Sequence, residues 1–148
     1  MKSLHKFLAT NAPAAVILIR LAVGAIFFSE GIQKFLFPND LGAGRFAKLG
    51  IPNADFFGPF VGTFETLCGS LVLLGLFTRI AAIPLLIIIS TAIVTTKFAT
   101  LSEKGFWVTA HEGRTDFSMF LSIIFLLVVG AGAWSMDVRL ARKFNKSS

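Results

Sequence analysis

The sequence is poor in residues that carry redox chemistry or covalent cross-links. Its 148 residues include one cysteine, Cys68, two histidines and no tyrosine. A single thiol excludes a disulfide within the chain and a CxxC redox pair. Both histidines, His5 and His111, lie outside the apolar runs, so the chain alone cannot supply paired imidazoles to a haem within a membrane. The sequence therefore contains no evident electron-carrying group.

Charged residues are also scarce, at 15% of the chain against 55% hydrophobic residues. A soluble domain of this size could not cover so much apolar surface, so the lipid bilayer is the expected solvent. The net charge of +6 is spread over ends and loops, which argues against nucleic-acid binding. We expect a single membrane domain over residues 1–148, with no room for a separate soluble catalytic domain.

Four apolar runs are long enough to cross a bilayer as α-helices, which takes about 20 residues. They cover about residues 14–37, 56–77, 80–98 and 115–134. The sequence therefore predicts an all-α fold, a membrane four-helix bundle. Phe46 and Leu49, three residues apart, add a short interfacial helix between the first and second spans. A cleavable signal peptide is the competing interpretation of the first run, but Arg20 interrupts it.

The remaining segments are predicted to be loops and tails, including residues 99–114 between the third and fourth spans. Four spans place both termini on one side of the membrane. Seven of the cations in the ends and loops fall on that side and six on the other. The charge rule for membrane loops then weakly favours cytoplasmic termini, with the flank of the first span deciding.

Four ionisable residues lie within the first two spans, namely Arg20, Glu30, Lys34 and Glu65. Each costs about 2.5 to 3.5 kcal/mol near the bilayer centre, so such residues usually face the bundle interior with a partner. Either Arg20, or Lys34 together with Glu30, could neutralise Glu65. Two roles stay open: a structural network that sets helix register, and a site for a polar headgroup, a transferable proton or a quinone-like ligand.

Small and hydroxyl residues share faces with these charges. Arg20 and Lys34 lie in one stripe of the first helix with Gly24 and Gly31, and Glu65 lies with Gly58, Gly62 and Gly69. Glycines at this spacing let another helix approach closely. Thr91 and Thr95 share a face of the third helix, and we include them with these charges in one candidate ligand-binding or buried polar network. Hydrogen bonds across or along the helices are the ordinary role of such hydroxyls. His111 beside Glu112 supplies too few ligands for a metal site, so no metal is expected.

Taken in order, several motifs resemble the DoxX family of bacterial membrane proteins. They are an arginine early in the first span, SEGIQKF, a short helix ending in LGIP, LLGLFTRIAA after a glutamate-glycine second span, and GAGAWSMD after the fourth. The similarity covers roughly Val16 to Asp137. The positions that match the motif residues of the family are Arg20, Gly31, Lys34, Glu65, Gly69, Gly75 and Arg79. Asp116 stands where a glutamate is expected.

The resemblance implies a four-helix bundle in the bacterial cytoplasmic membrane. Some relatives are membrane subunits of quinone-linked sulfur oxidoreductases, others are partners of redox or oxidative-stress enzymes, and most have no assigned activity. We therefore expect an accessory subunit that holds a quinone or lipid near Arg20, Lys34 and Glu65, with electrons from a partner redox enzyme. The alternatives are a non-catalytic scaffold or assembly factor whose glycine faces dock other membrane proteins, and a permeation protein that acts as a homo-oligomer.

Overall fold

The computed structural model describes residues 12–146, and within them it contains seven α-helices and no strand. The helices are α2 (Val16–Leu36), α3 (Ala43–Lys48), α4 (Ala54–Leu74), α5 (Thr78–Lys104), α6 (Phe106–Glu112), α7 (Arg114–Val129) and α8 (Met136–Lys146). The predicted all-α class is thus confirmed for this part of the chain, and the short helix predicted between the first two spans is α3.

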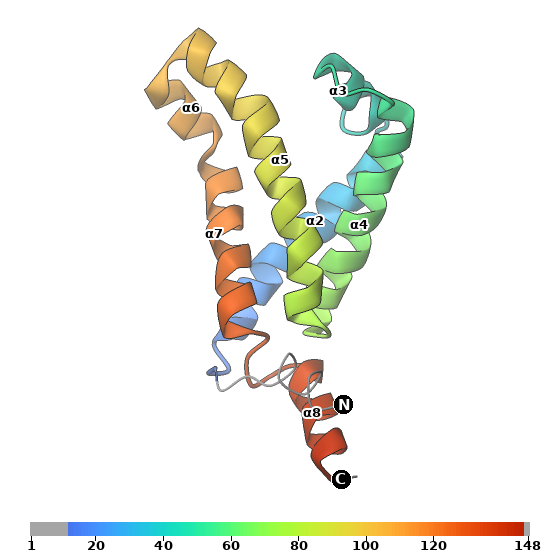
Figure 1. The fold of residues 1–148 in the computed structure, drawn as a ribbon, viewed down its shortest axis with the longest axis vertical. Helices are drawn as coiled ribbons and strands as arrows, with labels where there is room; N and C mark the ends of the chain where they lie inside the picture. Colours follow the sequence, from blue (N-terminus) through green and yellow to red (C-terminus); the bar gives the residue numbers. More distant parts are fainter. Residues whose placement is uncertain (1–11, 147–148) are drawn as a thin grey trace.

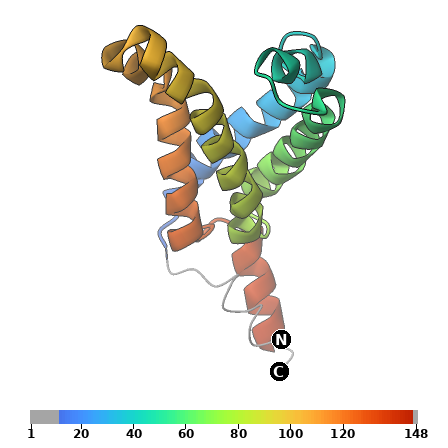
Figure 2. The same ribbon diagram turned by 45° about the horizontal axis from the view of Figure 1, so that its top comes forward.

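The long helices diverge from one end of the molecule. α4 and α5 part from the turn that joins them, α2 packs along α4, and α7 packs along α5, so that the two pairs form a V (Figure 1). α3 lies at the tip of the first pair and α6 at the tip of the second, which we call the open end (Figure 2). α8 lies beyond the opposite, closed end, where the hydrophobic core brings the four long helices together through Val23, Val72, Leu85 and Ile123.

Glycines allow α2 and α4 to touch backbone to backbone. A methyl group added at Gly24 would lie 2.9 Å from the carbonyl oxygen of Gly69. Seven residues further along α2, one added at Gly31 would lie 2.6 Å from the carbonyl oxygen of Gly62. The two helices therefore meet at two levels, one heptad apart, where a side chain of any size would separate them. Gly58 lies instead against α3, since its added methyl group would meet the backbone nitrogen of Ala43 at 2.6 Å.

A methyl group at Gly69 should therefore destabilise the α2–α4 pair. In Gly69→Ala the new carbon would lie 2.6 Å from the backbone nitrogen of Phe28, which cannot move aside as a flexible side chain could. We expect a loss of about 1 to 3 kcal/mol in stability, as for other overpacked interiors. Thermal unfolding in detergent measures it. Gly113→Ala is the matched control, because its methyl group would meet only the Thr109 carbonyl oxygen within 3.4 Å, and a loss as large in the control would contradict the explanation.

Three helices, α2, α4 and α5, are long and apolar enough to cross a membrane. Large apolar side chains project outward from them, as a lipid environment requires: Leu18 is 67% exposed and Phe98 is also 67% exposed. The fourth predicted span contains α7, but that helix has only 16 residues and ends at Gly130, whose φ is 85°. At 1.5 Å per residue it is about 24 Å long, shorter than the hydrocarbon core of about 30 Å. Three helices therefore qualify as candidate spans, and the fourth span stays a prediction.

The loop predicted at residues 99–114 is wrong. α5 continues to Lys104, and Phe106–Glu112 forms α6. The polar residues in this segment suggested a loop, but it contains no proline, and only its glycines interrupt the helices: Gly105 ends α5 with a φ of 79°, and Gly113 separates α6 from α7. The basic segment after the fourth predicted span is likewise helical, as α8.

Candidate functional site

Arg20 lies near the closed end, where the residue is 2% exposed and its guanidinium donates to backbone carbonyls within residues 12–146. Nε donates to Val72 O at 3.0 Å and Nη2 donates to Leu73 O at 2.8 Å, both in the last turn of α4. Nη1 donates to the carbonyls of Ala131 and Trp134 in the segment between α7 and α8, at 3.1 and 2.6 Å. The bonds to Val72 and Leu73 add a charged donor to carbonyls of the last turn of α4, where the positive charge suits the negative end of the helix.

Asp137 completes this network from the first turn of α8. Its carboxylate accepts hydrogen bonds from the backbone N–H groups of Phe77 and Thr78, at 2.6 and 3.1 Å, where α5 begins. Its own N–H donates to Gly75 O at 2.9 Å. Burial raises the pKa of the Asp137 carboxyl, although these hydrogen bonds and the charge of Arg20 oppose the rise. The network joins the α4–α5 turn to the chain entering α8.

The structure thus separates Arg20 from the other predicted site residues. Arg20 precedes Lys34 by 14 positions, which is about 21 Å along the α2 axis. Arg20 donates to backbone carbonyls and makes no ion pair with Glu65. The geometry therefore does not favour the prediction that Arg20 contacts a ligand held beside Lys34 and Glu65. Arg79 has a similar role, because it donates from Nε to Leu127 O at 3.1 Å and from Nη2 to Val128 O at 3.0 Å, at the end of α7.

Lys34 is the cation that meets Glu65. Its Nζ lies 2.6 Å from Glu65 Oε2, and the two side chains are 9% and 6% exposed. Glu30 lies one turn before Lys34, with its carboxylate 3.8 Å from Nζ and 49% exposed, and its carbonyl oxygen accepts from Nζ at 3.4 Å. Among the described residues, Glu65 Oε2 accepts no hydrogen bond of good geometry in spite of this close ion pair. The pair is buried between α2 and α4, with its hydrogen-bonding capacity only partly used.

The ion pair faces a cavity of about 710 Å³ within the V. Glu30, Lys34 and Glu65 line it from α2 and α4. Thr91, Thr95 and Thr96 line it from α5, and Asp116 from α7. Apolar side chains make up most of the remaining wall, and α3 contributes Arg45 and Phe46 near the open end. The cavity therefore joins a predominantly apolar volume to a few polar groups, the usual composition of a site for a small lipophilic molecule.

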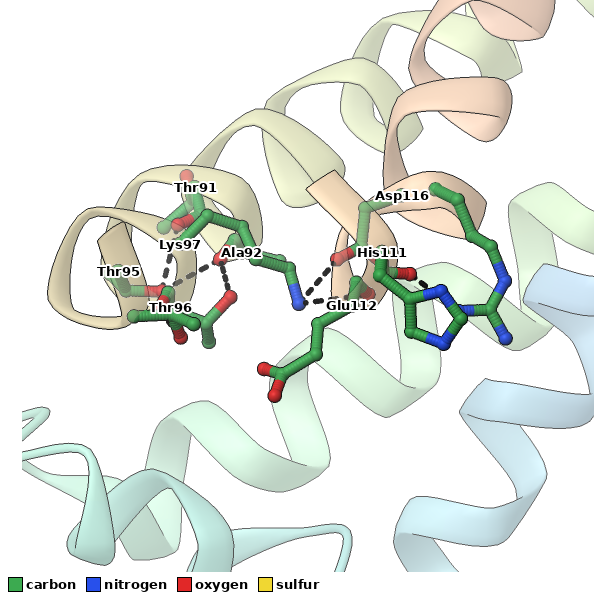
Figure 3. A network of polar contacts seen from close by, with 10 residues as sticks. Thr91, Ala92, Thr95, Thr96, Lys97, His111, Glu112 and Asp116 are labelled. Atoms are coloured by element: carbon green, nitrogen blue, oxygen red, sulfur yellow. Dashed lines mark hydrogen bonds and ion pairs between the residues drawn. The ribbon is translucent and has the colours of Figure 1, made fainter. Parts of the chain in front are cut away.

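A second ion pair joins α5 to α7. Lys97 Nζ lies 3.1 Å from Asp116 Oδ2 and donates to the carbonyl oxygen of Glu112 at 3.3 Å. Figure 3 shows this ammonium between the two acidic residues, beside the threonines of α5. The roles of Lys97 and Asp137 were not predicted from the sequence. A signal for Asp137 was present, since an acidic residue after Ser135 and before a basic stretch suits the first turn of a helix; no comparable signal pointed to Lys97.

The predicted helix-packing glycines do make close helix contacts, but these contacts are between helices of this chain and not with another protein. Gly24, Gly31, Gly62 and Gly69 are taken up by the α2–α4 contact, and Gly58 by α3. His111 and Glu112 lie together on α6. Across residues 12–146, no group of three or more His, Cys, Asp or Glu side chains is close enough to hold a metal ion.

Three apolar helices, buried charges held between them and a lipid-facing apolar surface define this chain as a polytopic α-helical membrane protein. It belongs to the DoxX family, whose model matches residues 15–98. It is also 52% identical over 144 residues to the uncharacterized membrane protein Rv3486 of Mycobacterium tuberculosis, an alignment that covers 93% of this chain and 88% of that protein. No solved structure matches the chain. The family match includes the Lys34–Glu65 pair and the α5 threonines, whereas Asp116 lies outside it.

Proposed function

We propose that this DoxX protein holds a quinone or a similar lipid-soluble ligand in the cavity, with the polar head at the Lys34–Glu65 ion pair. In this proposal the protein is an accessory membrane subunit of a redox-linked system. The observation that carries it is the position of the ion pair, buried in the wall of a cavity of about 710 Å³. Sites for small organic molecules usually have volumes of about 300 to 1,000 Å³.

The chemistry of the pair suits a head group that exchanges carbonyl and hydroxyl forms. An ammonium has three N–H donors, and within the described residues those of Lys34 are directed to the Glu65 carboxylate and the Glu30 carbonyl. One donor is then left for a ligand oxygen. Glu65 can accept a proton or a hydrogen bond from a ligand hydroxyl. Burying two charges in apolar surroundings is costly, and a ligand that uses them explains why they line a cavity.

A partner enzyme supplies the electrons in this proposal, because the sequence contains no evident electron-carrying group. The protein would lie in the bacterial cytoplasmic membrane with both termini in the cytoplasm, as the distribution of cations weakly favours. A ligand that partitions into lipid could then reach the cavity without passing through water.

The scaffold hypothesis receives less support from the geometry. It relied on glycine faces that dock other membrane proteins, whereas Gly24, Gly31, Gly62 and Gly69 already lie between α2 and α4. A docking surface would therefore have to use other residues. The cavity, in contrast, is lined by Glu30, Lys34 and Glu65 without any rearrangement.

Lipid extraction from the purified protein tests the proposal. We expect wild-type protein, isolated in mild detergent, to retain quinone that mass spectrometry detects after solvent extraction. Glu65→Gln keeps the side-chain shape but removes the charge, and loss of one charged hydrogen bond of about 1.5 to 3 kcal/mol should reduce affinity about 10-fold to 150-fold. Glu103→Gln is the matched control, since this residue is exposed on α5 and does not line the cavity.

The proposal fails if folded, monodisperse wild-type protein carries no quinone and takes none up from quinone-loaded nanodiscs. It also fails if Glu65→Gln and Glu103→Gln retain the same amount as wild type, because the ligand would then be bound elsewhere.

A further inference from the structure

The hydroxyl groups on the α5 wall all donate to their own helix. Thr91 Oγ1 donates to Ile87 O at 2.9 Å, Thr95 Oγ1 to Thr91 O at 2.8 Å, and Thr96 Oγ1 to Ala92 O at 2.7 Å. Figure 3 shows Thr91, Thr95 and Thr96 gathered on this stretch of α5. A hydroxyl has one hydrogen and two lone pairs. Once the hydrogen is used within the helix, each of these oxygens can only accept a hydrogen bond from a molecule in the cavity.

Two carboxylates that line the cavity have the same bias. Glu65 is buried and can only accept hydrogen bonds, and its Oε2 lies 2.6 Å from Lys34 Nζ. Asp116 presents a carboxylate, which accepts only, and its Oδ2 is already directed to Lys97. The side-chain donors that line the cavity besides Lys34 are few, namely Arg45 on α3 and Thr115, which precedes Asp116 in the first turn of α7.

We infer that the cavity selects a head group that carries hydrogen-bond donors, and therefore the hydroxyl-bearing, reduced form of the ligand over its carbonyl-only, oxidised form. This inference rests on the proposed function and adds its chemical preference. A quinone offers only acceptors, so it can pair with Lys34 but gives no hydrogen bond to the hydroxyl oxygens of α5 or to the Glu65 carboxylate. A quinol with the same tail has two O–H groups and can donate to both walls. A site lined mainly by acceptors therefore disfavours an analogue that lacks donors.

The charged side chains that line the cavity favour a ligand whose head group is a neutral hydrogen-bond donor over a ligand that is an anion. The ionisable side chains lining the cavity are three carboxylates and two cations, namely Glu30, Glu65, Asp116, Lys34 and Arg45. A ligand that added a negative charge would meet carboxylates on both walls. A hydroxyl group adds donors without adding charge.

Two matched pairs of probes test the inference on the full-length protein in nanodiscs. The first pair is decylubiquinol and decylubiquinone, kept anaerobic. The second is 4-decylphenol and 4-decylanisole, which cannot change redox state and differ chiefly by the loss of the O–H donor. We expect the hydroxyl-bearing member of each pair to bind about 10-fold tighter, as the gain of one or two hydrogen bonds of about 1 kcal/mol each implies.

The double variant Thr91→Val, Thr95→Val should lower this ratio in both pairs, chiefly by weakening binding of the hydroxyl-bearing member, while Thr96 and Glu65 remain as acceptors. Valine keeps the branched shape, and the lost hydroxyls served only their own helix, so the fold should survive. Thr100→Val is the control, because Thr100 Oγ1 also donates back along α5, to Thr96 O at 3.0 Å, but does not line the cavity. This variant should keep the wild-type ratio.

Equal binding within both pairs, or tighter binding of decylubiquinone and 4-decylanisole, would overturn the inference while leaving a ligand site in place. An equal loss of the ratio in Thr100→Val would also overturn it, since the wall hydroxyls would then not be the cause. Failure of all four probes to bind folded protein would count against the proposed function itself, and the inference would fall with it.

Discussion

Arg20→Met is expected to destabilise the protein strongly. The substitution removes the donor that Arg20 supplies to the carbonyl groups of Val72, Leu73, Ala131 and Trp134, and it removes the positive charge that faces Asp137. Removing one partner from a buried charged network costs about 3 to 5 kcal/mol, a large share of the 5 to 15 kcal/mol that holds a typical domain together. The apparent melting temperature should fall by roughly 6 to 20 °C for a chain of this length.

The single cysteine supplies the measurement. Cys68 is 5% exposed, so a thiol-reactive dye should label it only as the helices separate on heating. Arg20→Lys should fall between wild type and Arg20→Met, because an ammonium keeps the charge but lacks the planar fork that reaches both α4 and the α7–α8 segment. Arg142→Met, at an exposed position of α8, is the control. An unchanged labelling temperature in Arg20→Met would show that the network does not hold the closed end together.

Lys34→Met should destabilise the protein by about 3 to 5 kcal/mol, because it leaves the Glu65 carboxylate buried without a cation. The double variant Lys34→Met, Glu65→Leu should recover at least half of this loss, since a buried ion pair can usually be replaced by apolar side chains of similar size at little net cost. Both variants should lose bound quinone. Labelling of Cys68 on heating reports stability, and solvent extraction with mass spectrometry reports the ligand.

Lys104→Met is the matched control for this experiment. Lys104 lies 3.2 Å from Glu112, but the two side chains are 54% and 40% exposed, and exposed pairs contribute only about 0 to 1 kcal/mol. A double variant as stable as wild type that still carries quinone would show that the Lys34–Glu65 pair only sets helix packing. If Lys34→Met were as stable as Lys104→Met, leaving the buried Glu65 carboxylate without a cation would not destabilise the protein, contrary to the prediction.

Much of the fold follows from local pattern. The apolar runs of the first two spans became α2 and α4 within a few residues of the predicted ends, because an α-helix satisfies its backbone hydrogen bonds within a single segment and so suits a long apolar run in lipid. The third predicted span coincides with α5 but ends too early, because α5 continues to Lys104. Polar residues such as Ser102 and Glu103 suggested a loop, although such residues are compatible with a helix. The fourth was extended past Gly130, because composition alone does not reveal a glycine with positive φ.

The candidate site was only partly predictable. Glu65 stood out because an ionisable residue in an apolar helix demands a partner, and Glu30, Lys34, Thr91 and Thr95 were named as residues that could surround it. Arg20 was equally plausible as that partner by sequence. It lies instead against the carbonyl groups of Val72 and Trp134, contacts between segments that are far apart in the chain.

By itself the sequence determined the environment and the elements: membrane helices, glycine faces at a fixed spacing, and a few charges that could not be left exposed to lipid. These properties depend on composition and on neighbours along one helix. Only the tertiary structure decided which cation meets Glu65, that the glycine faces are used within the bundle, and that the two helix pairs open around a cavity. Those outcomes depend on how separate helices are tilted and rotated against one another, and the balance of many small packing contacts sets that arrangement.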